Sequence, residues 1–133
     1  MQNEIRVPII SDADIVIARQ KGRSFAAEIG FTQGDLTLIA TAISELTRNI
    51  VEYAKKGEII IRGTQNGTKK GIEIIAHDEG PGIPDISLAM QDGYSTRRSL
   101  GLGLPGTRRL MDEFDIISNS GDGTTVTIKK WIP

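Results

Sequence analysis

Several features that define common protein classes are missing from this chain. It has no cysteine in its 133 residues, which excludes a disulfide framework and a thiolate metal site. Its 16 basic and 17 acidic residues nearly cancel, which argues against a general nucleic-acid binder, because such proteins carry a basic excess. No apolar run reaches the length of a membrane span, and the start of the chain does not resemble a signal peptide. We therefore expect a cytoplasmic protein that folds as one domain over residues 1–133.

Histidine is nearly absent as well. The single histidine, His77, lies inside a predicted strand over residues 72–77. This position does not offer the exposure on a helix that a phosphate-accepting histidine needs. We interpret His77 as a packing or hydrogen-bonding residue rather than a catalytic one.

Glycine, in contrast, is concentrated in a stretch from Asp78 to Gly106. One glycine cluster occupies residues 78–82 and a second occupies residues 101–106, where it leads into a predicted helix that runs to Phe114. Glycines let the backbone approach a ligand closely, and a helix N-terminus offers free N–H groups and a positive dipole end that suit phosphate. The stretch therefore predicts a nucleotide pocket, with the segment between the clusters as a mobile lid.

The other segments predict an α+β fold, with one layer of helices on a mixed, mostly antiparallel sheet. Hydrophobic periodicity and turn residues predict helices over residues 12–29 and 33–54, and strands over residues 4–10, 58–63, 72–77, 115–118 and 124–129. Turns are expected at 66–71 and 120–123.

Particular residues set the expected boundaries of these elements. Pro8 indicates an edge strand because it cannot donate a ladder hydrogen bond. Residues 11–14, Ser-Asp-Ala-Asp, resemble a capping box that begins the first helix, and Gly30 is expected to end it in a left-handed conformation. Gly57 is expected to end the second helix.

The second predicted helix carries two polar residues beside its apolar stripe. The stripe has helical spacing and comprises Leu36, Ile39, Ile43, Leu46 and Ile50. Glu45 and Asn49 lie on one face that flanks this stripe, so they could line a cleft, with Asn49 as a neutral Mg²⁺ ligand and Glu45 as a base or water ligand. Alternatively both simply face solvent, and the spacing alone favours that second interpretation.

The loop candidates also have two interpretations each. Asp78 follows a strand and precedes glycines, so its carboxylate could accept a hydrogen bond from an adenine amino group, or could bond its own turn backbone. Arg97 and Arg98 lie in the expected lid, where they could contact phosphate or remain solvated loop charges.

Two familiar phosphate-binding motifs do not fit the second glycine cluster. Residues 101–106 match the three-glycine dinucleotide fingerprint, but a polar loop precedes them instead of a strand. They also fail as a P-loop, because Thr107-Arg108 stands where Lys-Ser/Thr is required.

Taken together, four motifs resemble those of the GHKL ATPase/kinase superfamily, which includes gyrase and the histidine kinases. Residues 45–49 (Glu-Leu-Thr-Arg-Asn) resemble its N box, residues 78–82 its D-x-G-x-G box, residues 101–104 its G-x-G-x box, and residues 121–124 its final glycine-threonine turn. Within the superfamily, the stretches at 42–46, 80–86 and 103–114 resemble the switch serine kinases of bacterial stressosome and partner-switching modules. We expect neither a self-contained histidine kinase nor a gyrase-type enzyme, because no phosphorylatable dimerisation helix precedes the motifs and no transducer domain follows them.

The resemblance implies a Bergerat-type ATP site and a role for each matching residue. Asn49 would hold Mg²⁺, Glu45 would act as base or orient the attacking hydroxyl, and Asp78 would read adenine. The other implied contacts are to the nucleotide: Gly80 and Gly82 shape the adenine pocket, Gly101, Leu102, Gly103 and Leu104 cradle phosphates, and Thr124 closes the adenine side. Gly82 would also be the hinge of a lid at 83–100, in which Arg97 or Arg98 senses the γ-phosphate.

The function implied by the resemblance is an ATP-dependent protein serine/threonine kinase in a stress-response pathway. Its substrates would be STAS-domain antagonist or scaffold proteins, and on release it would activate a PP2C-type phosphatase by direct binding. Two rivals stay open: an anti-sigma factor that also has kinase activity, and a nucleotide-gated binding module without turnover.

Overall fold

The computed structural model describes residues 4–80, 103–119 and 123–133. In chain order, its elements are β1 (Glu4–Ile9), α1 (Asp12–Ile29), α2 (Gln33–Asn49), the π-helix η1 (Ile50–Ala54), β2 (Gly57–Asn66), β3 (Lys69–Asp78), α4 (Gly103–Leu110), β4 (Glu113–Asn119) and β5 (Gly123–Trp131). Among these residues, no helix combines the length and apolar character that a membrane span needs.

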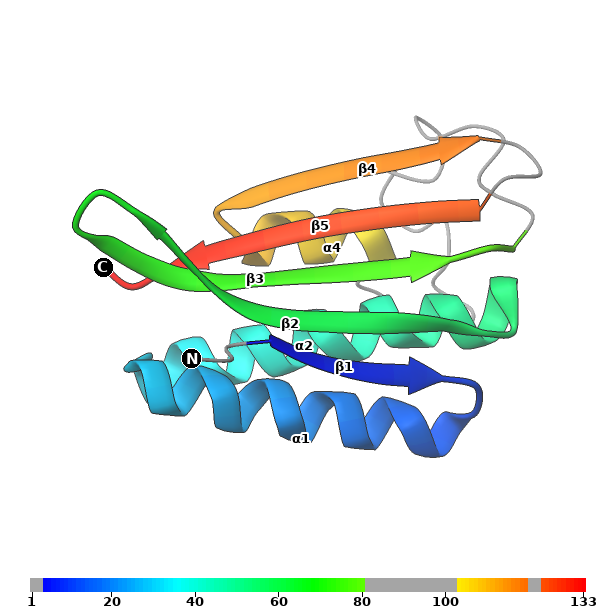
Figure 1. Cartoon of the computed structure of the whole chain (residues 1–133), viewed down its shortest axis with the longest axis horizontal. Helices are drawn as coiled ribbons and strands as arrows, with labels where there is room; N and C mark the ends of the chain where they lie inside the picture. Colours follow the sequence, from blue (N-terminus) through cyan, green and yellow to red (C-terminus); the bar gives the residue numbers. More distant parts are fainter. Residues whose placement is uncertain (1–3, 81–102, 120–122) are drawn as a thin grey trace.

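The five strands form one sheet with the order β1-β2-β3-β5-β4, and all four ladders between the described strands are antiparallel. The described helices cover one face of this sheet, and none of them lies on the other, open face (Figure 1). The α+β prediction is therefore confirmed, and β1 is an edge strand, as Pro8 indicated.

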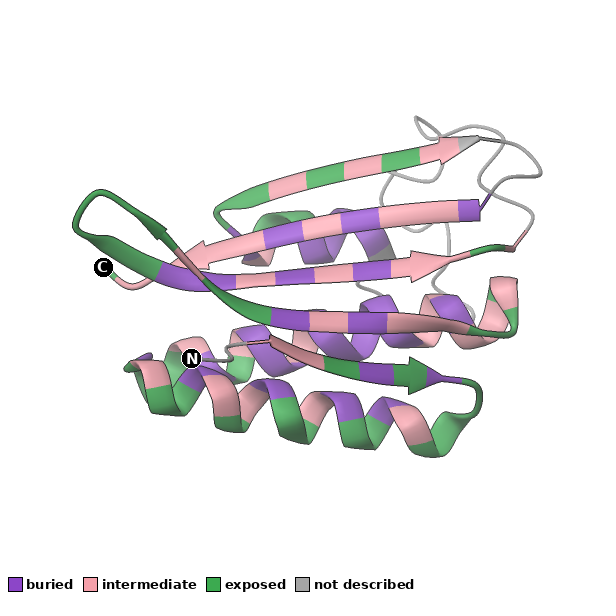
Figure 2. Ribbon diagram, in the orientation of Figure 1, coloured by how far each residue is buried: buried purple, intermediate pink, exposed green. Residues whose placement is uncertain are grey.

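The core lies between the sheet and the helices, and the strands alternate between buried and less buried residues (Figure 2). All five apolar residues of the predicted stripe, four on α2 and Ile50 at the start of η1, are buried. They pack in one cluster with inward-facing residues of the sheet, among them Ile59, Ile61, Ile72, Ile74 and Ile128. This burial of aliphatic side chains from both layers is the main favourable term that holds α2 against the sheet.

The first helix begins and ends as predicted. The Asp14 carboxylate accepts hydrogen bonds from the backbone N–H groups of Ile10 (2.9 Å) and Ser11 (3.1 Å), so it satisfies donors at the helix start. The helix ends at Gly30, whose N–H donates to the carbonyl groups of Ala26 and Ala27.

Two predicted boundaries were wrong. The second helix is not ended by Gly57: α2 passes into η1, Lys55 takes a left-handed φ of 76°, and Gly57 is already the first residue of β2. The β2–β3 hairpin is also longer than predicted. Its strands continue to Asn66 and from Lys69, because the polar residues there still pair across the ladder.

The helix after the second glycine cluster is shorter than predicted. It ends at Leu110, and Phe114 belongs to β4. The spacing of Leu110 and Phe114 fits a helix, but tertiary hydrogen bonds favour a turn between them. The Asp112 carboxylate accepts from the backbone N–H of Trp131 at 2.7 Å, and the Asp112 N–H donates to the carbonyl of Lys129, so β4 starts there beside β5.

Candidate nucleotide site

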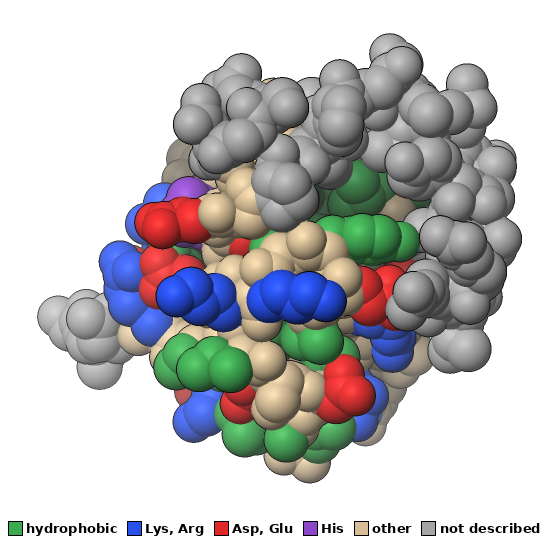
Figure 3. Space-filling view, turned by 90° about the vertical axis from the view of Figure 1, so that its right-hand side faces the viewer, with side chains coloured by type: hydrophobic (Ala, Val, Ile, Leu, Met, Phe, Trp, Pro, Cys, Tyr) green, Lys and Arg blue, Asp and Glu red, His purple; other side chains and the backbone are tan. Residues whose placement is uncertain are grey.

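Two of the predicted nucleotide residues, Asp78 and Thr124, lie together at one end of the sheet, where β3 ends and β5 begins. Asp78 lies opposite Gly57 of β2 on one side and opposite Thr124 of β5 on the other. The end of α2 with η1 and the start of α4 lie toward the same end of the molecule (Figure 1). Figure 3 views the molecule from that end and shows side chains of both charge signs interspersed on it.

The Asp78 carboxylate is half-buried and already serves the turn that follows β3. Its Oδ1 accepts a hydrogen bond from the backbone N–H of Gly80 at 2.9 Å, which is the turn role that the sequence offered beside adenine binding. An ionised carboxylate offers about four lone-pair sites, so this bond leaves acceptor capacity for a ligand. Next to it, Nδ1 of His77 is 2.9 Å from Oγ1 of Thr125, which agrees with a hydrogen-bonding histidine.

Two glycines allow this corner to close. A Cβ on Gly80 would lie 2.6 Å from the Cβ of Ala54 in η1, so a side chain there would push the turn away from the helix. Gly123 has a φ of 89°, and a Cβ on it would meet the carbonyl oxygen of Asp78. Beside it, Oγ1 of Thr124 is 2.8 Å from Oγ of Ser118 on β4. The corner is therefore built from close backbone contacts rather than from bulky side chains.

The end of α2 reaches the same corner. A Cβ on Gly57 would lie 3.0 Å both from the Cβ of Asp78 and from Cγ2 of Ile50, the residue that follows Asn49. Asn49 itself is half-buried at the last position of α2. The structure thus brings Ile50, directly after Asn49, and Asp78 close to the same glycine, although the two segments are far apart in the sequence.

Glu45 is deeply buried, so the expectation that it faces solvent was wrong. Only 2% of the residue is exposed, and its Oε2 accepts a hydrogen bond from Nη1 of Arg48 at 2.7 Å. The spacing of apolar residues could not reveal this burial, because it marks only one buried face of α2. In fact α2 packs against α1 and the sheet and also against α4, so its C-terminal half is buried nearly all round.

The second glycine cluster is described only from Gly103. This residue begins α4, and the following Leu104 is buried at 8% exposure. The remaining candidates, Gly82, Gly101, Leu102, Arg97 and Arg98, lie outside the described residues, as does the expected lid at 83–100.

Sequence reasoning missed two polar residues near this end of α2 and α4. Arg48 pairs with Glu45, and its i,i+3 spacing from Glu45 was the available signal. Thr107 is completely buried in α4. From the sequence, we used this residue only to reject a P-loop and did not predict its burial. Nothing in its local pattern distinguishes it from an exposed threonine.

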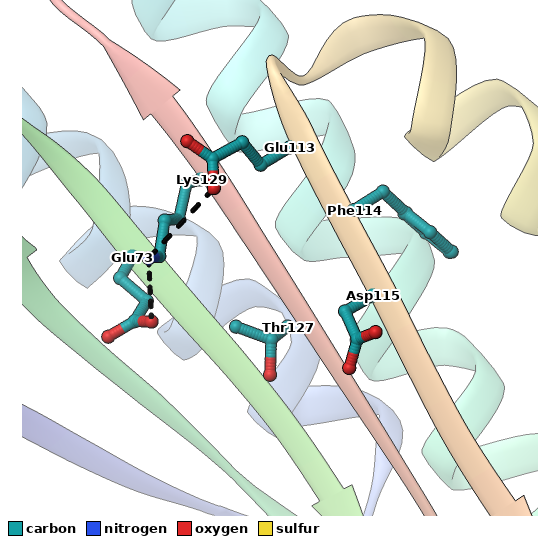
Figure 4. A pocket seen from close by; sticks show the side chains of 6 residues that line it. All are labelled: Glu73, Glu113, Phe114, Asp115, Thr127 and Lys129. Atoms are coloured by element: carbon teal, nitrogen blue, oxygen red, sulfur yellow. Dashed lines mark ion pairs between the residues drawn. The ribbon is translucent and has the colours of Figure 1, made fainter.

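A concave site among the described residues lies on the open face of the sheet, and Asp78 is not part of it. This pocket of about 230 Å³ is lined by Glu73, Glu113, Phe114, Asp115, Thr127 and Lys129. Figure 4 shows that the Lys129 ammonium lies between Glu73 and Glu113, with N–O distances of 3.8 and 4.0 Å. Within the described part of the chain, no group of three His, Cys, Asp or Glu side chains is arranged to hold a metal ion.

The open-face network continues across the sheet through Arg62. Its Nε donates to Oε1 of Glu73 at 2.6 Å, and its Nη1 lies 3.7 Å from Glu4. The hydrogen bond to the Glu73 carboxylate, with the attraction of that charge, raises the pKa of Arg62 above its ordinary value. These groups satisfy one another on an accessible surface, so the pocket is not a candidate for ATP.

Comparisons with known proteins agree with the geometry. Residues 11–130 match the family model of the histidine kinase-like ATPase domain. The chain is 52% identical over 132 residues to the serine/threonine-protein kinase RsbT of Bacillus subtilis (strain 168), covering 99% of each chain. It is also 37% identical over 121 residues to the anti-sigma F factor of Thermoanaerobacter sp. (strain X514), covering 86% of this chain and 83% of the other.

A solved structure shares the fold. It is the crystal structure of the RsbU and RsbW domains of Rv1364c from Mycobacterium tuberculosis, with a TM-score of 0.65 and 22% identity. The match covers 99% of this chain and 34% of that one, so this chain spans about a third of the solved chain. At this level of identity, the similarity concerns the fold alone.

Proposed function

The chain belongs to the family of histidine kinase-like ATPase domains and is an ATP-dependent protein serine/threonine kinase, and we propose that it phosphorylates STAS-domain antagonist or scaffold proteins. The observation that carries the proposal is that Gly57 lies close to both Asp78 and Ile50, and Ile50 directly follows the helix that carries Glu45 and Asn49. A buried carboxylate and a half-buried amide one turn apart on α2 are polar groups that packing alone does not require.

The nucleotide base is assigned to the Asp78 side of this corner. The Asp78 carboxylate would accept a hydrogen bond from the adenine amino group, because its bond from the Gly80 N–H leaves other lone pairs free. Gly80 keeps the turn close to η1. Thr124, directly opposite Asp78, would close the adenine side. Gly82 would shape the same pocket, as the motif implies.

The phosphates are assigned to the start of α4. The first N–H groups of a helix have no partner within it and carry its positive dipole end, which favours phosphate at Gly103 and Leu104. Gly101 and Leu102 would extend this cradle, and Arg97 or Arg98 would contact the γ-phosphate. These four assignments rest on the motif.

Magnesium fits the donor set at the end of α2. Mg²⁺ typically takes few protein ligands and completes its octahedron with substrate phosphates and water, so a single neutral oxygen from Asn49 is suitable. When bound, Mg²⁺ would neutralise phosphate charge. Asn49 is half-buried and would hold its amide oxygen in a restricted geometry.

Glu45 is assigned to the transfer step. Phosphoryl transfer depends mainly on positioning and electrostatic stabilisation, and a carboxylate can orient the attacking hydroxyl or accept its proton. Glu45 lies one helical turn before Asn49, so both act on the same side of the nucleotide. The γ-phosphate would pass to the serine or threonine oxygen of the partner, ADP would leave, and the hydroxyl proton would be released.

The kinase would also be a binding protein. After phosphorylating its STAS-domain partner, the released chain would bind and activate a PP2C-type phosphatase in a stress-response pathway. The support is the 52% identity with the RsbT kinase over nearly the whole chain. Use of ATP fits a cytoplasmic location.

The test is transfer of labelled γ-phosphate from ATP to purified STAS-domain proteins. We expect the label on a serine or threonine of at least one, and none on a substrate whose acceptor is replaced by alanine. If ATP binds but no partner accepts phosphate, the chain is a nucleotide-gated binding module without turnover.

A second candidate function is favoured by the anti-sigma F relatives. At 37% identity, they allow that this chain also holds a sigma subunit. Pull-down with purified sigma factor, in the presence of ATP and of ADP, separates the two functions. Retention of sigma factor would support an anti-sigma kinase, and its absence would leave the STAS-directed kinase.

A further inference from the structure

The pairing of Glu45 with Arg48 assigns a role to a residue that the motif does not name. The Glu45 side chain is 3% exposed and the Arg48 side chain is 26% exposed, so the bond between them joins a buried carboxylate to a cation that reaches the surface. Its N–O distance of 2.7 Å is short, as expected for a charge-assisted hydrogen bond.

The geometry of α2 places this bond beside the metal-binding candidate. At about 100° per residue, Arg48 lies roughly 60° to one side of Glu45 and Asn49 roughly 40° to the other. The Glu45 carboxylate is thus bracketed by a cation and by an amide, both one turn later on the helix. A glutamate has three side-chain torsions, and a short bond to one carboxylate oxygen restricts all of them.

Burial alone does not require this arrangement. Taking a carboxylate out of water is costly unless it is paired, and a well-packed apolar residue at position 45 is often no less stable than an ion pair. A buried pair at the end of the helix that carries Asn49 therefore points to a demand for a fixed carboxylate.

We propose that Arg48 is a positioning residue that holds the Glu45 carboxylate in its orientation for phosphoryl transfer. This inference rests on the proposed function, because it needs Glu45 to act in the transfer step. Arg48 itself would contact neither ATP nor the attacking hydroxyl. Its loss would let the Glu45 side chain leave the productive geometry, while the adenine corner at Asp78 stays intact.

The experiment measures ATP affinity and the single-turnover transfer rate at saturating ATP for Arg48→Ala, Arg48→Lys, Glu45→Gln and the Glu45→Gln/Arg48→Ala double variant. We expect Arg48→Ala to slow transfer by about 10- to 100-fold, as small misplacements of catalytic groups do, with the Kd for ATP within about twofold of wild type. Arg48→Lys should recover part of the rate. In the Glu45→Gln background, loss of Arg48 should change the rate by less than about twofold, because there is no carboxylate left to position.

The outcomes separate this inference from the proposed function. Independent, multiplicative losses in the double variant, or weaker ATP binding with an unchanged saturated rate, would overturn the positioning role alone. A wild-type rate in Glu45→Gln would overturn both the role of Glu45 and the inference. If Arg48→Ala does not fold, Arg48→Gln, which keeps a donor of similar length, replaces it in the measurements. The matched control is Arg62→Ala on the open sheet face, which should leave the transfer rate and the ATP affinity unchanged.

Discussion

Two glutamates in this chain each pair with an arginine at nearly the same distance, but in opposite surroundings. Glu45 and Arg48 are 2.7 Å apart on α2, with side-chain exposures of 3% and 26%. Glu73 and Arg62 are 2.6 Å apart across β2 and β3, with exposures of 13% and 44%. Distance therefore does not distinguish the pairs, whereas burial and position do.

The difference in burial indicates which of the two ion pairs serves function. On the open face, Glu73 shares Arg62 and Lys129 in a network that solvent reaches, and such pairs contribute little to stability. In α2, the Glu45 carboxylate is withdrawn from water on the helix that carries Asn49, and such burial costs free energy that an ion pair often only balances. We accordingly expect changes at Glu45 or Arg48 to affect catalysis. Changes at Glu73 or Arg62 should have mild effects.

The largest expected effect comes from Glu45→Gln, with Glu73→Gln as its matched control. Loss of a base or orienting carboxylate should slow phosphoryl transfer by about 10²–10⁴-fold while ATP stays bound. The control should transfer at close to the wild-type rate. Single-turnover assays at saturating ATP check both variants, and equal rates for the two would abolish the distinction between the pairs.

Asp78→Asn should weaken ATP binding rather than the transfer step. Removing a charged acceptor typically costs about 1.5–3 kcal/mol, which corresponds to about 10- to 150-fold in affinity. Asp115→Asn, a strand carboxylate in the open-face pocket, is the control and should bind ATP normally. Calorimetric titration measures both, and unchanged affinity in Asp78→Asn would leave Asp78 as a turn residue only.

The comparison also shows how far the sequence predicts the structure. The apolar stripe of α2, the capping box of α1 and the edge strand at Pro8 were predicted correctly, because each depends on local periodicity or on local backbone chemistry. The order of the GHKL motifs indicated the family, which the relatives confirm.

Other features could not be predicted because they depend on tertiary contacts. Burial of Glu45 requires α4 on the far side of α2, and a helical period carries no information about a second neighbour. The π-helix η1 and the positive φ of Lys55 depend on how the chain returns to β2. Local spacing also predicted a helix up to Phe114. In the structure, Phe114 belongs to β4, because Asp112 forms hydrogen bonds with β5 just before that strand.

Asn49→Ala should have a smaller effect, confined to the metal-dependent part of nucleotide binding. Loss of one ligand should weaken Mg·ATP binding by about tenfold, roughly 1.4 kcal/mol, and leave binding of ATP without Mg²⁺ nearly unchanged. Asn66→Ala at the tip of the β2–β3 hairpin is the control. Titrations with and without Mg²⁺ check the difference, and equal weakening in both would point to a structural role.

The smallest effect is expected for Arg62→Ala. Because the Arg62 side chain is 44% exposed, loss of its bond to Glu73 should lower the free energy of unfolding by no more than about 1 kcal/mol. Urea unfolding measures this value, and Arg48→Ala in the same series should lose more, because it removes a charged partner from a buried carboxylate. The reverse order would contradict the assignment of the two pairs.

We propose that the corner around Asp78, and not the open-face pocket, binds the nucleotide. Backbone amide chemical shifts recorded during titration with a non-hydrolysable ATP analogue and Mg²⁺ test it most directly. We expect the largest chemical-shift changes at Asn49, Asp78, Gly80 and Thr124. The amide shifts of Glu73, Asp115 and Lys129 should change little. Saturable changes at the open-face residues, with none around Asp78, would contradict this proposal.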